Sequence, residues 1–485
     1  MRFSKAVVKY RIPILILTVL LMIPSVMGMA ATRVNYDMLT YLPSDMETVI
    51  GQEELLKDFN KGAFTFLIFE DMPQKDVAKL KEKVENIDHV DTVLWYDSVA
   101  DLSIPMEILP EEITKEFNTD HSTMMAVFFD SGTSEDTTMD AVKEIRRVCG
   151  EQCFVSGMTA LVVDLKDLCE QEEPIYVGLA VLLACAAMFL LLDGWLIPLV
   201  FLASIGAMIL LNMGTNFLLG TISFVSNSVT NILQLALSLD YAIIFCNHFK
   251  EEHETLPLKE AVIESLAKSI PEISSSSLTT IGGLVAMLFM QFKIGPDMAI
   301  CLIKAILFSM LSVFVVMPGL LMLFGPYMSK TKHRNFVPKI SFVGRYAYKT
   351  RKIVPIVFAV VLVFAYHFQT QCPYAYGYGP IKTPVLNETQ IADNMIDENF
   401  TKSNLVALVV PKNDDYRVEA AMIKELESHD EVDHTRGLSN IEAMDGYMLE
   451  DRLTSRQFSE MAGLDYELAQ VVYTGYALEN DEYGQ

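Results

Sequence analysis

A single carboxylate lies in a long apolar stretch of this chain. Asp240, with Tyr241 beside it, stands in the run "LALSLDYAIIFCNHFKEE", which carries no other charge before Lys250. An ionised aspartate at the centre of a membrane helix costs about 3 kcal/mol on insertion scales, so such a residue should face protein or water. A carboxyl that is neutral when dry and charged when wetted can carry protons along a gradient. We therefore predict that Asp240 is part of a proton relay, in which the Tyr241 hydroxyl bonds the carboxyl or a partner helix; a packing or interfacial tyrosine is the alternative.

Other polar side chains share the side of this helix that carries Asp240. With about 100° per residue, they fall within an arc of about 160°: Tyr241, Gln234, Asn227, Ser223, Thr230 and Ser238. A polar half-face inside lipid must meet another helix or a water path. These side chains either line a pathway with Asp240 or only hydrogen-bond neighbouring helices.

Two further groups are candidates for the same pathway. Ser276, Thr279 and Thr280 lie near the start of the next apolar segment and could line the path or bond back to carbonyls of their own helix. Lys304, which follows Asp297 by seven positions, could pair with that carboxylate, extend toward the membrane surface, or act as a counter-charge.

Charge and apolarity are segregated along the chain. Of 485 residues 51% are hydrophobic, yet the formal net charge is −25. Long uncharged runs alternate with acidic stretches, which is typical of an integral membrane protein with water-exposed domains. Because a bilayer core about 30 Å thick needs about 20 apolar residues per helix, we predict a transmembrane bundle of seven spans: 12–31, 174–192, 195–214, 221–248, 274–290, 296–324 and 353–368.

Basic residues in the flanks predict the topology of a multi-pass cell-membrane protein. The N-terminal flank and the linker 326–352 are both basic, and six crossings place them on the same, cytoplasmic side. The first apolar run is long for a signal peptide, so residues 1–31 are interpreted as a cytoplasmic N-terminus and an anchor. Residues 32–173 and 369–485 are then extracytoplasmic, and 174–325 hold the second to sixth spans. Residues 254–271 form a cytoplasmic amphipathic helix on the membrane surface or a plain connecting helix.

The first outer segment alternates strand-like and helix-like stretches. Their order is β-α-β-β-α-β, typical of a ferredoxin-like α+β domain, as in "AFTFLIFED", "PQKDVAKLKEKVENID" and "VDTVLWYD". Cys149 and Cys153 lie close together in this segment and could form a bridge or remain free thiols.

The region after the last span repeats the beginning. "NLVALVVPKNDDYRVEAAMIKELESHDEVDHT" follows the pattern of "AFTFLIFEDMPQKDVAKLKEKVENIDHVDTV", and such internal repeats are a frequent building plan of transporters. The second copy gives one β-α-β and a helical stretch over 454–475, and lacks further strands to close its sheet. We expect a fragment of a chain of roughly 700 residues, two repeats long, or a half-sized protein whose missing helices come from a homo-oligomer or a companion chain.

The order of spans and outer domains resembles the resistance-nodulation-division superfamily, and most closely its MmpL branch. Three stretches carry the resemblance: "LSLDYAIIFCNHFKEE" to its fourth span, "SSLTTIGGLVAMLF" to its fifth, and "IGPDMAICLIKAILFSMLSVFVVMPGLLMLFG" to its sixth. The resemblance implies a transporter driven by protons that exports lipid or other hydrophobic substrates. The absence of a G-x-x-x-x-G-K-[ST] loop argues against ATP hydrolysis in this chain.

Two other functions remain open. Relatives in the superfamily help secreted proteins across membranes, and others sense sterols or lipids without pumping. The chain contains no nucleophile elbow, no HExxH and no metal-spaced Cys/His cluster, so we expect no enzyme and no cofactor. The expected partners are membrane lipids, a lipid-like substrate and protons, and not nucleic acid.

Overall fold

The computed structural model describes most of the chain, in sixteen pieces: residues 1–59, 62–95, 97, 117–119, 121–150, 153–192, 194–328, 331, 341–372, 387–399, 403–410, 416–430, 432–436, 442–444, 447–448 and 470–477. The chain folds into two compact units. The helical unit consists of Met1–Asn35 and Cys169–Tyr374, and the sheet unit of Tyr36–Leu168 and Ala375–Gln485.

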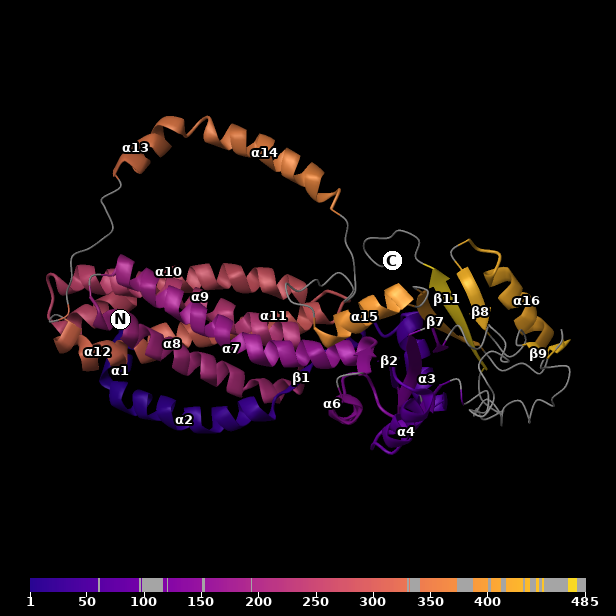
Figure 1. Cartoon of the computed structure of the whole chain (residues 1–485). Coiled ribbons are helices and arrows are strands. Elements are labelled where there is room, and N and C mark those ends of the chain that lie inside the picture. The colour runs from indigo at the N-terminus through magenta and orange to yellow at the C-terminus, as the bar shows by residue number, and fades with distance from the viewer. Residues whose placement is uncertain are drawn as a thin grey trace. The chain divides into compact units, whose positions relative to one another are not determined.

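The helical unit is a bundle of long apolar helices (Figure 1). Its described elements are α1 (Arg2–Lys9), α2 (Arg11–Ala31), β1 (Arg33–Asn35), α7 (Met158–Leu191, which begins in the sheet unit), α8 (Leu196–Gly214), η5 (Asn216–Leu219), β6 (Thr221–Ser223), α9 (Phe224–His253), α10 (Leu258–Met287), α11 (Ile294–Leu311), the π-helical turn η6 (Ser312–Val316), α12 (Met317–Met328), α13 (Ser341–Thr350) and α14 (Val354–Gln369). The short strands β1 and β6 pair in parallel and join the end of α2 to the start of α9.

Five helical stretches of the described chain are long and apolar enough to cross a membrane. They are Arg11–Ala31, Met158–Leu190, Leu196–Leu219, Phe224–His253 and Ile294–Tyr327. A sixth is added if Phe342–Thr350 and Val354–Gln369, which meet at 75°, count as one span. The chain is therefore a multi-pass membrane protein with five or six such stretches, and the predicted span 274–290 is not among them.

That segment is instead the second half of the 30-residue helix α10. We expected a separate amphipathic element over 254–271, but α10 begins at Leu258 and continues through Pro271 without a break. Val262 and Leu266 of the predicted apolar stripe are fully buried in the same core cluster as Val8 of α1. The stripe thus packs against other helices of the bundle, because this buries its apolar side chains more completely than a membrane surface would.

The sheet unit begins with the predicted β-α-β-β-α-β order. After α3 (Glu47–Phe59) come β2 (Ala63–Glu70), α4 (Gln74–Glu85), β3 (Val90–Leu94), β4 (Ser122–Phe129), α6 (Asp136–Cys149) and β5 (Cys153–Ser156). All neighbouring strands are antiparallel, in the order β3-β4-β2-β5. The side chains of Leu67, Val127 and Phe129 point into the core on one face of the sheet, and Ile68, on the opposite face of β2, is also buried. Cys149 and Cys153 are both buried, free thiols.

A second sheet forms after α15 (Glu388–Asn399). It contains β7 (Ser403–Val410), α16 (Tyr416–Leu426), β8 (Val432–Arg436) and β11 (Gln470–Ala477), with strand order β7-β11-β8, and a small β9 (Glu442–Met444) and β10 (Tyr447–Met448) pair. We predicted a helix over 454–475, and residues 470–475 are a strand instead. Residues 454–469 lie outside the described part. β-Branched and aromatic residues in "QVVYTGYA" favour a strand, and two flanking strands supply the hydrogen bonds that the local pattern could not show.

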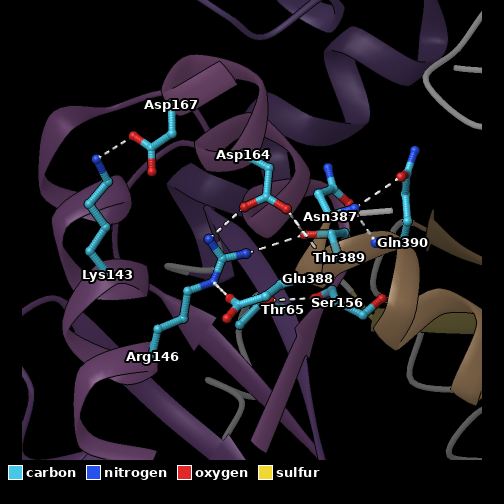
Figure 2. A network of polar contacts seen from close by, with 10 residues as sticks. All are labelled: Thr65, Lys143, Arg146, Ser156, Asp164, Asp167, Asn387, Glu388, Thr389 and Gln390. Atoms are coloured by element: carbon cyan, nitrogen blue, oxygen red, sulfur yellow. Dashed lines mark hydrogen bonds and ion pairs between the residues drawn. The ribbon is translucent and has the colours of Figure 1, made fainter. Parts of the chain in front are cut away.

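The helix α15 is fixed to the first sheet by a network of polar contacts (Figure 2). Arg146 of α6 contacts Asp164 at 2.6 Å and Glu388 at 3.2 Å, and Asp164 in turn accepts from the Thr389 hydroxyl at 2.6 Å. Beside this network, Ala392 and Met395 pack in one cluster with Ile68 of β2. Described residues of the segments 32–173 and 369–485 therefore share one folded unit.

Candidate functional site

The two residues of the Asp-Tyr pair in α9 lie in different environments, one exposed and one buried. Ser223 caps α9, since its hydroxyl accepts the Val225 amide at 3.2 Å. Consecutive helical residues differ by about 100° around the axis, and here Asp240 is exposed whereas Tyr241 is only 3% exposed. The Tyr241 hydroxyl has no hydrogen-bond partner among the described residues. The structure thus does not join the two predicted relay residues by a hydrogen bond.

Polar residues of α9 are buried along one face of the helix. Thr230, Gln234, Ser238 and Tyr241 follow at intervals of four, four and three positions, so they are stacked along the helix; we call them the α9 polar stripe. Ser238 donates to Ser309 of α11 at 2.7 Å. The predicted polar half-face therefore divides, because this stripe packs inside the bundle while Asp240 stays on its surface.

Neighbouring helices supply partners that sequence reasoning missed. Asn212 of α8 donates its amide to Gln234 at 2.9 Å. Ser204 of α8 and Ser312 of the π-helical turn lie 2.8 Å apart, and both are buried. A π-helical turn is rare and often marks a functional position, since its widened backbone leaves room between helices. The polar contacts thus run between α8, α9, α11 and η6.

The α9 polar stripe and its partners Asn212, Ser204, Ser309 and Ser312 form what we call the polar column, and several of its buried atoms have no partner within the described residues. Within the described residues, no hydrogen-bond partner exists for the Thr230 hydroxyl, the Gln234 Nε2, the Asn212 Oδ1 or the Tyr241 hydroxyl. Buried polar groups normally have a hydrogen-bond partner, and a buried donor or acceptor without one costs about 1–3 kcal/mol of folding free energy. Such a column can therefore exchange hydrogen bonds when the helices repack.

Lys304 joins the polar column to the end of α8. Its ammonium donates to the backbone carbonyl of Asn212 at 2.9 Å and to the Thr215 hydroxyl at 3.1 Å, and it also bonds the Asn216 side chain. A cation at the C-terminus of a helix meets free carbonyls and the negative end of the helix dipole. Within the described residues the Lys304 ammonium thus bonds the end of α8 rather than Asp297, and its role as a counter-charge in the pathway stays a prediction. The polar residues of "NMGTN" at the C-terminus of α8 could have indicated these partners of Lys304 from the sequence.

Asp297 has a separate role at the start of α9. Its Oδ2 accepts from the Ser223 backbone amide at 2.9 Å and from the Ser226 hydroxyl at 2.5 Å. A carboxylate at a helix N-terminus pairs with free amides and the positive end of the dipole. The two charges of α11 thus secure the ends of two neighbouring helices.

The remaining candidates lie apart from the buried column. Ser276, Thr279 and Thr280 of α10 are exposed, and the two threonine hydroxyls donate to Ser275 at 3.0 Å and Ser276 at 3.2 Å within their own helix. Asn227 is half-buried and donates to Glu173 of α7 at 3.4 Å. Glu173 was not among the site residues predicted from the sequence. No group of three or more His, Cys, Asp or Glu in the described chain is placed to hold a metal ion.

Part of the chain matches a protein-family model. Residues 114–347, which include α7 to α12, the polar column and Asp240, match the model of the MMPL family. No curated protein matches the chain.

Proposed function

We propose that this chain, which belongs to the MMPL family through residues 114–347, is a transporter driven by the proton gradient that exports lipid or other hydrophobic substrates. The coarser part of this statement, a multi-pass membrane protein of the MMPL type, follows from the family match and the apolar helices. The energy source, the substrate class, the cell-membrane location and the cytoplasmic N-terminus are the proposal.

One observation carries the proposal: an acidic side chain on the surface of α9 lies next to a buried column of incompletely paired polar groups. Asp240 is exposed on the surface of the bundle. Tyr241, the next residue, is buried and ends the α9 polar stripe inside the bundle. A charged aspartate at this depth costs about 3 kcal/mol on insertion scales, whereas the protonated form costs far less. Gain or loss of one proton at Asp240 would therefore change which packing of α9 is favoured.

The contacts at the helix ends can transmit a shift of α9 to the neighbouring helices α8 and α11. A shift of α9 would move Ser223 and Ser226 at Asp297, and Gln234 at Asn212. Asn212 is also held by Lys304, so α8 and α11 would respond together. The helix α7 is continuous from Met158 to Leu191 and would carry a movement of the bundle toward the sheet unit. In this mechanism the sheet unit, with ferredoxin-like domains, forms the path of the substrate.

The test is substrate export in cells that carry Asp240→Asn. The amide keeps the size of the side chain but cannot bind and release a proton, so we expect export to fall at least tenfold and the substrate to accumulate in the cell. Asp240→Glu keeps the carboxyl and should retain part of the activity. Protein levels are measured by immunoblot in parallel. Undiminished export by Asp240→Asn at a normal protein level would exclude the relay.

A second variant examines the buried end of the relay. Tyr241→Phe removes only the hydroxyl, which has no partner in the described part of the chain, so a purely packing role predicts no loss of export. Tyr176→Phe on the exposed side of α7 is the matched control. Loss of export in Tyr241→Phe alone supports transfer of protons through the hydroxyl.

A further inference from the structure

A cavity of about 360 Å³ lies within the helical unit, between α2, α7, α8 and α9. Its volume falls within the range of about 300–1,000 Å³ that is usual for small-molecule sites. The cavity is separate from Asp240 and from the Ser238–Ser309 contact, neither of which lines it. The proposed relay therefore does not account for it.

One end of this cavity is polar and is organised around a carboxylate. The Glu173 Oε1 accepts from the Asn231 amide at 2.9 Å, and its Oε2 accepts from the Asn227 amide at 3.4 Å. Each oxygen accepts once, and a carboxylate has about four acceptor positions, so the group is held in place and can still accept from a ligand. Glu170 and Asn216 line the same cavity.

The rest of the cavity is apolar. Val177, Val181 and Leu235 are among its lining residues. Along α7, the eight positions from Glu173 to Val181 correspond to about 12 Å. A ligand with a polar head at Glu173 and a hydrocarbon chain along α7 would match this division.

The negative charge of the residues that line the cavity favours a ligand with a positively charged head group. The lining includes Glu170 and Glu173 but no lysine or arginine. Lys304 lies nearby, but its ammonium is already engaged by Asn212, Thr215 and Asn216. We propose that the cavity binds an amphiphile with a positively charged head group, an alkylamine or a quaternary ammonium lipid, whose cation pairs with Glu173.

The binding is independent of the transport cycle, whereas the role of this amphiphile as the exported substrate rests on the proposed function. An anionic or phosphate-only head group would meet two carboxylates and no cation, so it is disfavoured. The ligand class of the transporter would then be cationic amphiphiles rather than lipids in general.

The test is binding of three probes of equal chain length to the purified full chain, measured by native mass spectrometry from a nonionic detergent. The probes are octadecylamine, octadecanol and octadecanoate. We expect the amine to bind at least tenfold more tightly than the other two. Glu173→Gln should remove this preference, because it removes the charge while keeping the size of the side chain and one of the two acceptor oxygens. Glu172→Gln, one position away and outside the lining, should keep it. Equal binding of all three probes to the unaltered protein would overturn the proposal.

A second pair of variants tests the chain-binding end. Val177→Trp fills the apolar part and should weaken octadecylamine at least tenfold, whereas Leu179→Trp on the same helix lies outside the lining and should not. Unchanged binding in Val177→Trp would also overturn the site. Asp240→Asn separates the two proposals, since it should stop export and leave octadecylamine binding unchanged. If Asp240→Asn exports normally while Glu173→Gln loses the amine preference, the relay fails and the site stands.

Discussion

At the scale of single residues, two charges seven positions apart on α11 serve different neighbours. Asp297 bonds the N-terminus of α9, and Lys304 bonds the C-terminus of α8. Each charge has the sign that its helix end favours. Charged side chains in membrane spans are therefore not only relay candidates, because some compensate the free backbone groups where another helix ends.

Replacing Lys304 should measure this compensation. Lys304→Met leaves the Asn212 carbonyl, the Thr215 hydroxyl and the Asn216 amide oxygen without this donor, and each unsatisfied buried group costs about 1–3 kcal/mol. We expect a clear decrease in the thermal unfolding temperature of the protein in detergent. Lys293→Met, at the exposed start of the same helix, should change the stability by less than about 0.5 kcal/mol. Equal effects of the two changes would contradict the role of Lys304.

At the scale of elements, the contact between α2 and α8 depends on two glycines. A Cβ atom built on Gly28 would lie 2.0 Å from the carbonyl oxygen of Gly214, and one built on Gly214 would lie 2.4 Å from the backbone of Ser25. Small residues allow membrane helices to approach closely, so that dispersion contacts hold them together. The helices α2 and α8 are packed at the limit that glycine permits.

A single methyl group should therefore separate these two helices. Gly214→Ala requires backbone movement, and overpacking costs about 1–3 kcal/mol. Gly206→Ala on the same helix meets nothing within 4 Å and should be neutral or stabilising by up to about 1 kcal/mol through helix propensity. Thermal unfolding of both variants in detergent gives the comparison. A stable Gly214→Ala protein would show that the helices are not in this close contact.

The attachment of α15 to the first sheet makes a second prediction at this scale. Arg146→Met removes the ion pairs to Asp164 and Glu388, and a hydrogen bond to a charged group is worth about 2 kcal/mol. We expect faster hydrogen exchange in α15 than in the unaltered protein. Its neighbour Arg147 is exposed and pairs only with Glu144 in the described chain, so Arg147→Met should leave the exchange of α15 unchanged. Similar exchange in both variants would mean that apolar contacts alone hold α15.

At the scale of the whole molecule, the open question of topology concerns α10. The predicted seven-span arrangement requires α10 to cross the membrane, whereas α10 is not among the five or six helical stretches of the described chain that are long and apolar enough to do so. Reporter fusions or cysteine labelling at Thr255, before α10, and at Gln291, after it, distinguish the two arrangements. We expect Thr255 on the cytoplasmic side and Gln291 on the opposite side. Both positions on one side would exclude the seven-span topology.

The sequence by itself determined the elements that depend on local pattern. Runs of apolar residues predicted the long helices, and alternation of apolar and polar residues predicted the β-α-β-β-α-β order before α7. These patterns are fixed by the helical and strand periods, which any stretch of chain carries within itself. For the same reason the sequence identified Asp240, since one carboxylate in an apolar run needs no neighbour to be recognised.

The tertiary structure decided which neighbours each face meets. The helical period places Asp240 and Tyr241 about 100° apart, but only the packing of the neighbouring helices determines that Tyr241 is buried and Asp240 exposed. The partners of Lys304 come from a different helix, and β11 is a strand because β7 and β8 pair with it. Glu173 meets Asn227 and Asn231 only when α7 lies beside α9. Spacing along the chain sets the direction of a side chain from its own axis, and the contacts across the chain decide what lies in that direction.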